Sequence, residues 1–141
     1  MTENWVGFAG SPKPDLNREL HTFSFELVCP RPYGEGHQIF TTQEGLGNWL
    51  GQVSKFDFRA GAKIKYEHDF QVFGATYASI RIPKSVVLVT ETLGEVSFDS
   101  HVADESFELK VSFQKALLEE EIGDWENLVT RAQSEITKAL S

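Results

Sequence analysis

The sequence predicts an α+β fold with a seven-stranded antiparallel sheet, two short helices after the first strand, and a long C-terminal helix. Apolar and polar residues alternate, as in strands with one buried face, in one segment before residue 30 and in five between residues 55 and 113. A sixth later strand, "VVLVTET" at 86–92, is apolar on both faces at first, as expected of a covered central strand. A glycine-rich segment at 33–51 separates these two parts. From residue 124 the apolar residues recur with the period of an amphipathic helix.

The first strand begins near Leu20, where Phe23, Phe25 and Leu27 alternate with polar residues. The prolines of "PRP" at residues 30–32 end it, because proline withholds the donor that the ladder needs.

The segment before this strand has little periodicity and contains two of the five prolines. We expect residues 1–18 to form an extended arm, anchored by Trp5 and Phe8. Residues 19–141 are then expected to form a single domain, because the chain has the length of one ordinary domain.

The segment 33–51 has apolar residues at rough helical spacing but carries five glycines. Each glycine costs about 1 kcal/mol relative to alanine inside a helix. We therefore expect two short helices, broken near residues 41–43 and stabilised by docking.

The later strands follow in hairpins, of which "RAGA" at 59–62 is a turn with Gly61 free to take a positive φ. Phe56 and Phe58 alternate with charged residues before that turn. In each strand after it, alternate residues are expected to share the buried face. They are Ile64, Tyr66, His68 and Phe70, then Thr76, Ala78, Ile80 and Ile82, then Val87 and Val89, then Val96 and Phe98, and finally Phe107, Leu109, Val111 and Phe113.

The C-terminal helix is predicted to start after Asp124, a residue suited to the N-cap. Its apolar face comprises Trp125, Leu128, Val129, Ala132, Ile136, Ala139 and Leu140. The acidic run "EEE" at 119–121 is expected to be a solvated loop before this helix, and a basic partner is the alternative reading.

Composition excludes several classes of function. The formal net charge of −8 argues against a nucleic-acid surface and against binding to an anionic membrane. The single cysteine, Cys29, rules out an internal disulfide and a multi-cysteine zinc site, and it is expected to be a buried, inert thiol rather than a nucleophile. The four histidines lack metal-ligand spacing, so no metal is expected. The start of the sequence lacks a signal peptide, which predicts a cytoplasmic protein.

The order of the predicted elements is that of the helix-grip fold. Four strings resemble the family of proteins similar to the C-terminal domain of the activator of Hsp90 ATPase, within the START-like (SRPBCC) superfamily. They are "REL" at 18–20, "NWLGQVSKFDFRAGAKIKY" at 48–66, "IRIPKSVVLVTE" at 80–91 and "IGDWENLVTRAQSEITKAL" at 122–140. The four strings follow the order and spacing of the family, and the resemblance extends over residues 18–140.

The chain departs from that family at two places. Where the family usually has "P-x-x-V-[WF]-x-A-[LF]-T", this sequence reads "YGEGHQIFT", with Gly36 and His37 at the valine and aromatic places. Glu91 falls near another position that is commonly aromatic. Both departures remove bulk and add a titratable group.

The resemblance implies a curved sheet that grips the long helix, with an apolar pocket between them. The family includes stress-related and co-chaperone-like proteins, and distant relatives bind lipids, hormones or polyketides. It implies no shared catalytic motif, and we expect no cofactor. The residues expected to line the pocket are Trp49, Phe56, Phe58, Tyr66, His68, Val89, Glu91, Phe98, Leu109, Val111, Trp125 and Val129. The aromatic members among them could equally form the core.

Three functions remain open from the sequence. The leading one is a monomeric or homodimeric module that binds an apolar or amphipathic small molecule. The second is a regulator that binds a chaperone through its surface. The third is a cyclase- or hydrolase-type enzyme, in which His37, His68 and Glu91 would converge in the pocket; burial would raise the pKa of an inward Glu91 and make it a general acid or base.

Overall fold

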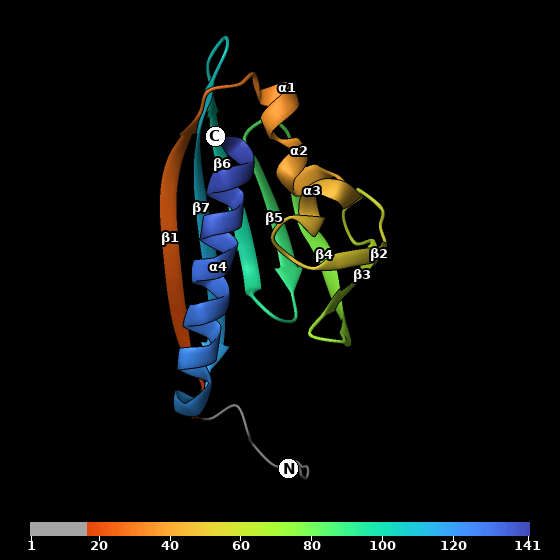
Figure 1. The fold of residues 1–141 in the computed structure, drawn as a ribbon, viewed down its shortest axis with the longest axis vertical. Helices are drawn as coiled ribbons and strands as arrows, with labels where there is room; N and C mark the ends of the chain where they lie inside the picture. Colours follow the sequence, from red (N-terminus) through yellow and green to blue (C-terminus); the bar gives the residue numbers. More distant parts are fainter. Residues whose placement is uncertain (1–16) are drawn as a thin grey trace, which may run out of the picture.

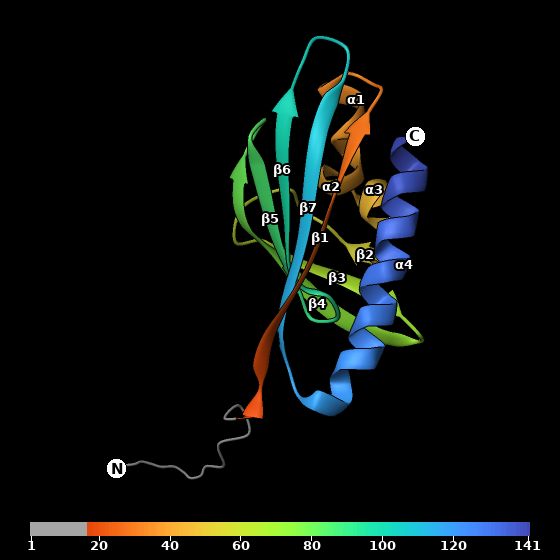
Figure 2. The same ribbon diagram turned by 90° about the vertical axis from the view of Figure 1, so that its left-hand side faces the viewer.

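The computed structural model describes residues 17–141, which form one antiparallel sheet with the helices on one of its faces (Figures 1 and 2). The strands are β1 (Glu19–Cys29), β2 (Gln52–Lys55), β3 (Lys63–His68), β4 (Gln71–Arg81), β5 (Ser85–Thr90), β6 (Gly94–Val102) and β7 (Phe107–Leu117). The helices are α1 (Tyr33–Gly36), α2 (Gln38–Thr41), α3 (Gln43–Gly47) and α4 (Ile122–Leu140), with the 3₁₀ turn η2 (Glu119–Glu121) before α4. Within this part of the chain, no helix is long and apolar enough to cross a bilayer.

The strand order is β1-β7-β6-β5-β4-β3-β2, and every neighbouring pair is antiparallel. Because α1 to α3 carry the chain from β1 to the opposite edge, β1 and β2 form the two edges of the sheet. Helix α4 then returns in front of β1, β7 and β6 (Figure 1). The predicted α+β helix-grip architecture is confirmed.

The pairing of β1 with β7 follows the predicted alternation. It runs over all eleven residues of β1, with Phe23 opposite Phe113 and Phe25 opposite Val111. These side chains point toward α4, while Ser24 and Glu26 point to the other face of the sheet, which the helices leave open. Cys29 at the end of β1 is fully buried, as predicted.

Strands β4 and β5 have the opposite facing from the one predicted. In β5 the inward residues are Val86 and Leu88, whereas Val87 and Val89 face outward with Glu91 beyond them. The run of apolar residues from Val86 to Val89 gives no alternation to follow, and the pairing with β6 sets the facing instead. In β4, Ala75 and Tyr77 point inward rather than Thr76 and Ala78. A β-bulge between Tyr77 and Ser79 then brings Ile80 back to the inner side.

The phenylalanines near the hairpins are also displaced from their expected strands. Strand β2 ends at Lys55, so Phe56 and Phe58 lie in the following loop, half-buried against the ring of Tyr77 at centroid distances of 6.3 and 5.0 Å. Strand β3 ends at His68, and Phe70 lies in the turn with 97% of its surface exposed.

The glycine-rich segment forms three short helices rather than two. The expected break occurs at Thr42, whose extended backbone starts α3 and whose Oγ1 accepts a hydrogen bond from Gly45 N at 2.9 Å. His37 separates α1 from α2. Gly36 is required by close packing, because a Cβ there would lie 2.4 Å from the Phe107 ring and 2.9 Å from the Cys29 sulfur.

The start of α4 differs from the prediction as well. The helix begins at Ile122, so Asp124 lies in its first turn and not at the N-cap. Glu121, in the "EEE" run, accepts a hydrogen bond from Leu118 N at 2.9 Å and pairs with Arg18. These contacts lower the pKa of its carboxyl group. The run is therefore an ordered turn rather than a loop.

The arm predicted for residues 1–18, with its anchors Trp5 and Phe8, lies outside the described residues except for Asn17 and Arg18.

Candidate functional site

The residues predicted to line a pocket mostly form a packed core. Tyr66, Phe98 and Val111 are fully buried between the sheet and the helices. The remaining deeply buried members of the predicted set are Trp49, Leu109, Trp125 and Val129, each at most 8% exposed. The ring of Phe98 stacks on Phe40 at a centroid distance of 4.5 Å and meets Trp49 edge-on at 5.5 Å. The space between the sheet and the helices is therefore occupied by side chains.

The polar atoms of these core aromatics are paired with the backbone. Trp49 Nε1 donates to Ile39 O at 2.8 Å, and Trp125 Nε1 donates to Leu93 O at 3.0 Å. The Tyr77 hydroxyl donates to Phe40 O at 2.7 Å. Buried indoles and phenols normally find such partners. These bonds hold α2 against Trp49 and β4, and α4 against the β5–β6 turn.

Two buried side-chain atoms of residues 17–141 lack this pairing. They are His37 Nδ1, between α1 and α2, and Ser100 Oγ, on the inner face of β6. Tyr33 of α1 connects them, since its ring lies 4.9 Å from the His37 ring and its hydroxyl lies beside Ser100. The Tyr33 ring also meets Phe107 edge-on at 5.2 Å. We call Tyr33, His37 and Ser100 the α1 polar cluster.

The ionisation of this cluster is set mainly by burial. Desolvation lowers the pKa of His37, although the carbonyls of Gly34 and Tyr33 lie near enough to raise it in part. No acceptor or donor is aligned with Nδ1 within the described chain. Burial raises the pKa of the Tyr33 phenol, and the nearby Ser100 hydroxyl lowers it in part. The two hydroxyl groups are nevertheless not aligned for a hydrogen bond, so Ser100 Oγ has no partner. At neutral pH the cluster is therefore a set of uncharged donors and acceptors.

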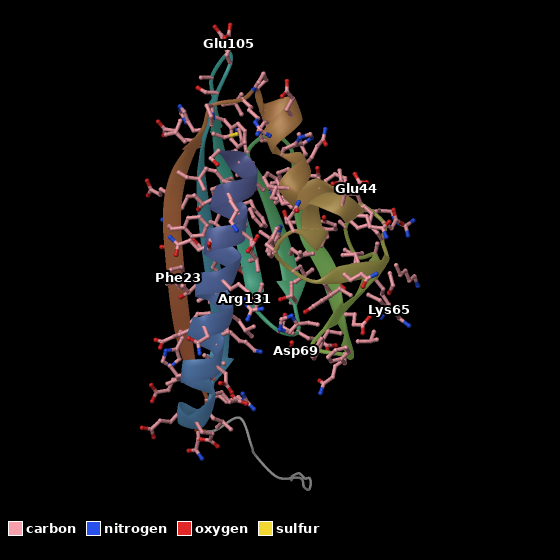
Figure 3. The ribbon with its side chains drawn as sticks, in the orientation of Figure 1. Phe23, Glu44, Lys65, Asp69, Glu105 and Arg131 are labelled. Atoms are coloured by element: carbon pink, nitrogen blue, oxygen red, sulfur yellow. The ribbon has the colours of Figure 1, made fainter. Side chains whose placement is uncertain are left out.

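The three candidate catalytic residues do not come together. His37 lies in the α1 polar cluster near the β6–β7 end of the sheet. His68 lies beside Asp69 at the β3–β4 turn, 3.6 Å from its carboxylate, and Figure 3 shows Asp69 far below Glu105, which lies at the top of the molecule between β6 and β7. Glu91 lies in the β5–β6 turn and is exposed. This separation leaves no shared site for proton transfer among them.

Val89 and Glu91 belong instead to a hollow on the open face of the sheet. It has a volume of about 330 Å³ and is lined by Lys63, Lys65 and Gly74 together with these two residues. Val89 is 43% exposed there, and the Glu91 carboxylate lies above Gly74. Both residues are thus remote from the helix-covered interior that was expected to hold them.

The α1 polar cluster contains two residues that the sequence prediction overlooked. His37 was a candidate, but Ser100 and Tyr33 were not. Ser100 continues the inward series of Val96 and Phe98 two residues further along β6, so the alternation itself carried the signal. No sequence pattern could have identified Tyr33, because it stands at the irregular start of the glycine-rich segment. In residues 17–141, no group of three or more His, Cys, Asp or Glu side chains is arranged to hold a metal ion.

Comparisons with known proteins show the fold. The sequence matches no protein-family model and no curated protein. Solved structures do match: a Bacillus halodurans protein at 13% identity with a TM-score of 0.70, covering 89% of this chain and 100% of that one. The Aha1 dimer from Colwellia psychrerythraea matches at 14% identity with a TM-score of 0.63, covering 85% of this chain and 96% of that one.

A third match is a protein from the dynemicin biosynthetic locus, at 14% identity and a TM-score of 0.64. It covers 84% of this chain and 46% of that one. At these identities the similarity shows the START-like, Aha1-type fold and nothing about shared chemistry.

Proposed function

We propose that the protein binds an uncharged, largely apolar small molecule that carries a hydroxyl or carbonyl group, with this group held by the α1 polar cluster. The observation that carries the proposal is the pair of unpartnered buried atoms, His37 Nδ1 and Ser100 Oγ. A buried polar atom without a partner costs about 1–3 kcal/mol, and native proteins leave few of them. Two such atoms around one tyrosine fit a site that a ligand completes.

The class of ligand follows from the charge of the cluster. Burial keeps His37 neutral near pH 7 by lowering its pKa, and Ser100 and Tyr33 can each donate or accept. A carboxylate would meet no charge partner in this cluster and would lose its hydration. The rings of Tyr33, Phe107 and Phe40 provide apolar surface beside the cluster for the rest of the molecule.

Access to the cluster requires movement of the short helices. Helices α1, α2 and α3 have four, four and five residues, and their stability depends on docking rather than on helix propensity. Elements of this kind open locally at low free-energy cost. A surface hollow of about 220 Å³, bounded by α1 to α3 and the C-terminal end of α4, is the route we assign to the ligand.

The fold supports this proposal in a general way, because a sheet closed by helices is an arrangement in which small molecules bind. We also infer that the chain belongs to the family of the Hsp90 ATPase activator C-terminal domain and acts in the cytoplasm. A surface regulator of a chaperone is the alternative function for the same fold. That function would leave the α1 polar cluster without a ligand.

Naphthol and naphthoate test the proposal, because they share one aromatic skeleton and differ in the charge of the polar group. Naphthol should raise the melting temperature and bind saturably, since a ligand specific for the native state stabilises it by RT ln(1 + [L]/Kd). Naphthoate should bind at least about tenfold more weakly, the factor that roughly 1.4 kcal/mol produces.

The matched variants are His37→Phe, which removes the unpaired nitrogen, and His101→Phe, on the exposed face of β6. Only the first should weaken naphthol binding. Equal affinity for both probes, or equal loss in both variants, would contradict a site at the cluster.

A further inference from the structure

Strand β1 is an open edge of the sheet. It pairs with β7 on one side over eleven residues, and the strand order places no described strand on its other side. Figure 2 views this edge directly, and no helix of the described chain covers β1 from that side. A row of backbone donors and acceptors is therefore free to pair with another strand.

Natural edge strands usually carry features that prevent such pairing, namely short length, lysine, proline or a bulge. Strand β1 has none of them. Its sequence, "ELHTFSFELVC", contains no lysine and no proline. Its pairing with β7 proceeds without a register shift. The edge is thus long and regular, and the charges it carries are the two carboxylates of Glu19 and Glu26.

The apolar residues of β1 that face outward are placed symmetrically about its centre. Leu20 and Val28 are 62% and 64% exposed, and each lies four residues from Ser24. If a second copy pairs antiparallel about a two-fold axis at Ser24, Leu20 of one copy lies directly opposite Val28 of the other. This register also uses all eleven residues of the strand.

The inner face matches in the same register. Phe23 would lie opposite Phe25 of the second copy, so two half-buried rings that already pack on Phe113 would be covered. Directly opposed aromatic residues are favourable cross-strand pairs. The remaining inward pairs would be His21 with Leu27 and, at the two ends of the strand, Glu19 with Cys29.

The charges on the strand permit this approach. Glu26 would lie opposite Thr22 of the second copy, and its own cross-strand neighbour is Lys110. The two copies of Glu26 would be about 14 Å apart along the strands, at roughly 3.4 Å per residue. That exceeds the screening length of about 8 Å at physiological ionic strength.

We propose that the protein forms a homodimer through antiparallel pairing of β1 with β1 of a second copy, centred on Ser24, which joins the two sheets into one. The proposal is independent of the small-molecule site, because the α1 polar cluster lies on other elements.

A cysteine placed on the two-fold axis tests the register directly. Ser24→Cys brings two thiols to directly opposed positions, about 4.5–5.5 Å apart at Cβ, from which a disulfide can form with a small adjustment. Thr22→Cys is the matched control on the same face, since its two copies would be about 14 Å apart. The native Cys29 is fully buried and should not react.

Mild oxidation of the full chain should therefore convert Ser24→Cys, and not Thr22→Cys, into a covalent dimer. Equal crosslinking of both variants, or crosslinking of neither, would overturn the proposal.

A charge exchange tests the same contact without a covalent bond. Leu20→Lys and Val28→Lys should each weaken dimerisation about tenfold or more in sedimentation equilibrium, because each adds a lysine of the kind that prevents pairing at natural edge strands and that β1 lacks. Combining Leu20→Glu with Val28→Lys should restore it, since each glutamate would then face a lysine of the other copy. A wild-type chain that stays monomeric at every concentration, or single variants that dimerise normally, would refute the interface.

Discussion

The buried polar groups are hydrogen-bonded at one end of the sheet and lack partners at the other. At the β5–β6 turn, Thr90 Oγ1 accepts from Leu93 N at 2.9 Å and donates to Gly94 O at 3.1 Å. The Tyr66 hydroxyl bonds the side chain and the backbone of Thr92 at 2.8 and 3.1 Å. At the opposite end, beneath α1, His37 Nδ1 and Ser100 Oγ have no partner in the described chain.

This contrast assigns structural stability to one end of the sheet and the proposed ligand binding to the other. The paired end fixes a turn, and Trp125 and Lys115 add bonds from α4 and β7 to the carbonyls of residues 91–93. The unpaired end is covered by helices of four or five residues, of which α1 and α3 contain glycine. Stability is therefore expected to concentrate at the first end and ligand binding at the second.

The largest effect is expected at the paired end. Thr90→Val keeps the shape of the side chain but leaves Leu93 N and Gly94 O buried without their partner. It should lower the free energy of unfolding by about 1–3 kcal/mol. Denaturant unfolding measures this loss. A change below about 0.5 kcal/mol would mean that the β5–β6 turn is not fixed by this hydroxyl.

The β3–β4 turn, near the paired end, has a backbone conformation that its residues disfavour, and a substitution that suits this conformation should increase stability. Asp69 and Phe70 have positive φ angles of 51° and 65°, a conformation for which Asn-Gly is preferred in two-residue hairpin loops. Phe70 is almost fully exposed, so little packing is lost on replacement. Phe70→Gly should therefore stabilise the protein by about 1 kcal/mol in the same measurement. Phe70→Ala, which removes the ring but keeps the Cβ, is the control and should show no such gain.

The pH dependence of stability distinguishes the two ends in another way. Because burial lowers the pKa of His37 below its ordinary value of 6.5, the unfolded chain binds a proton more readily than the folded one. The contribution of neutral His37 is therefore fully present above about pH 6.5 and is lost as the pH falls toward its folded pKa. His37→Phe should lose less stability than the wild type between about pH 6.5 and pH 5. Identical slopes for the two proteins would show that this ring is not buried in its neutral form.

The sequence predicted the order of the elements because alternation and turn residues are local signals. Strands β1 and β7 alternate cleanly, so their inward residues were predicted correctly. The facing of β5 could not be read, because Val86 to Val89 are all apolar and a shift of one residue exchanges the faces. The bulge in β4 and the early end of β2 depend on tertiary packing around Tyr77, which no local pattern reports.

The candidate site was predictable only in part. His37 was recognised because it stands where the family that the sequence resembles carries an aromatic residue. Glu91 was assigned to the same site because the facing of β5 was read one residue out of phase. His68 was assigned there because alternation gives the face of a residue and not its distance from another strand or helix. Whether a buried hydroxyl such as Ser100 Oγ has a partner depends on distances across the fold, so its unpaired state could not be inferred from the chain alone.

Ser100→Ala, measured for both stability and naphthol affinity, tests most directly whether the unpaired atoms exist for a ligand. Removing an unsatisfied hydroxyl should leave the free energy of unfolding within about 0.5 kcal/mol of the wild type or raise it. The same change should weaken naphthol binding by about tenfold, the factor that loss of one hydrogen bond of roughly 1.4 kcal/mol produces. A variant that is destabilised as much as Thr90→Val, yet binds naphthol with unchanged affinity, would show that Ser100 serves the fold and not a ligand.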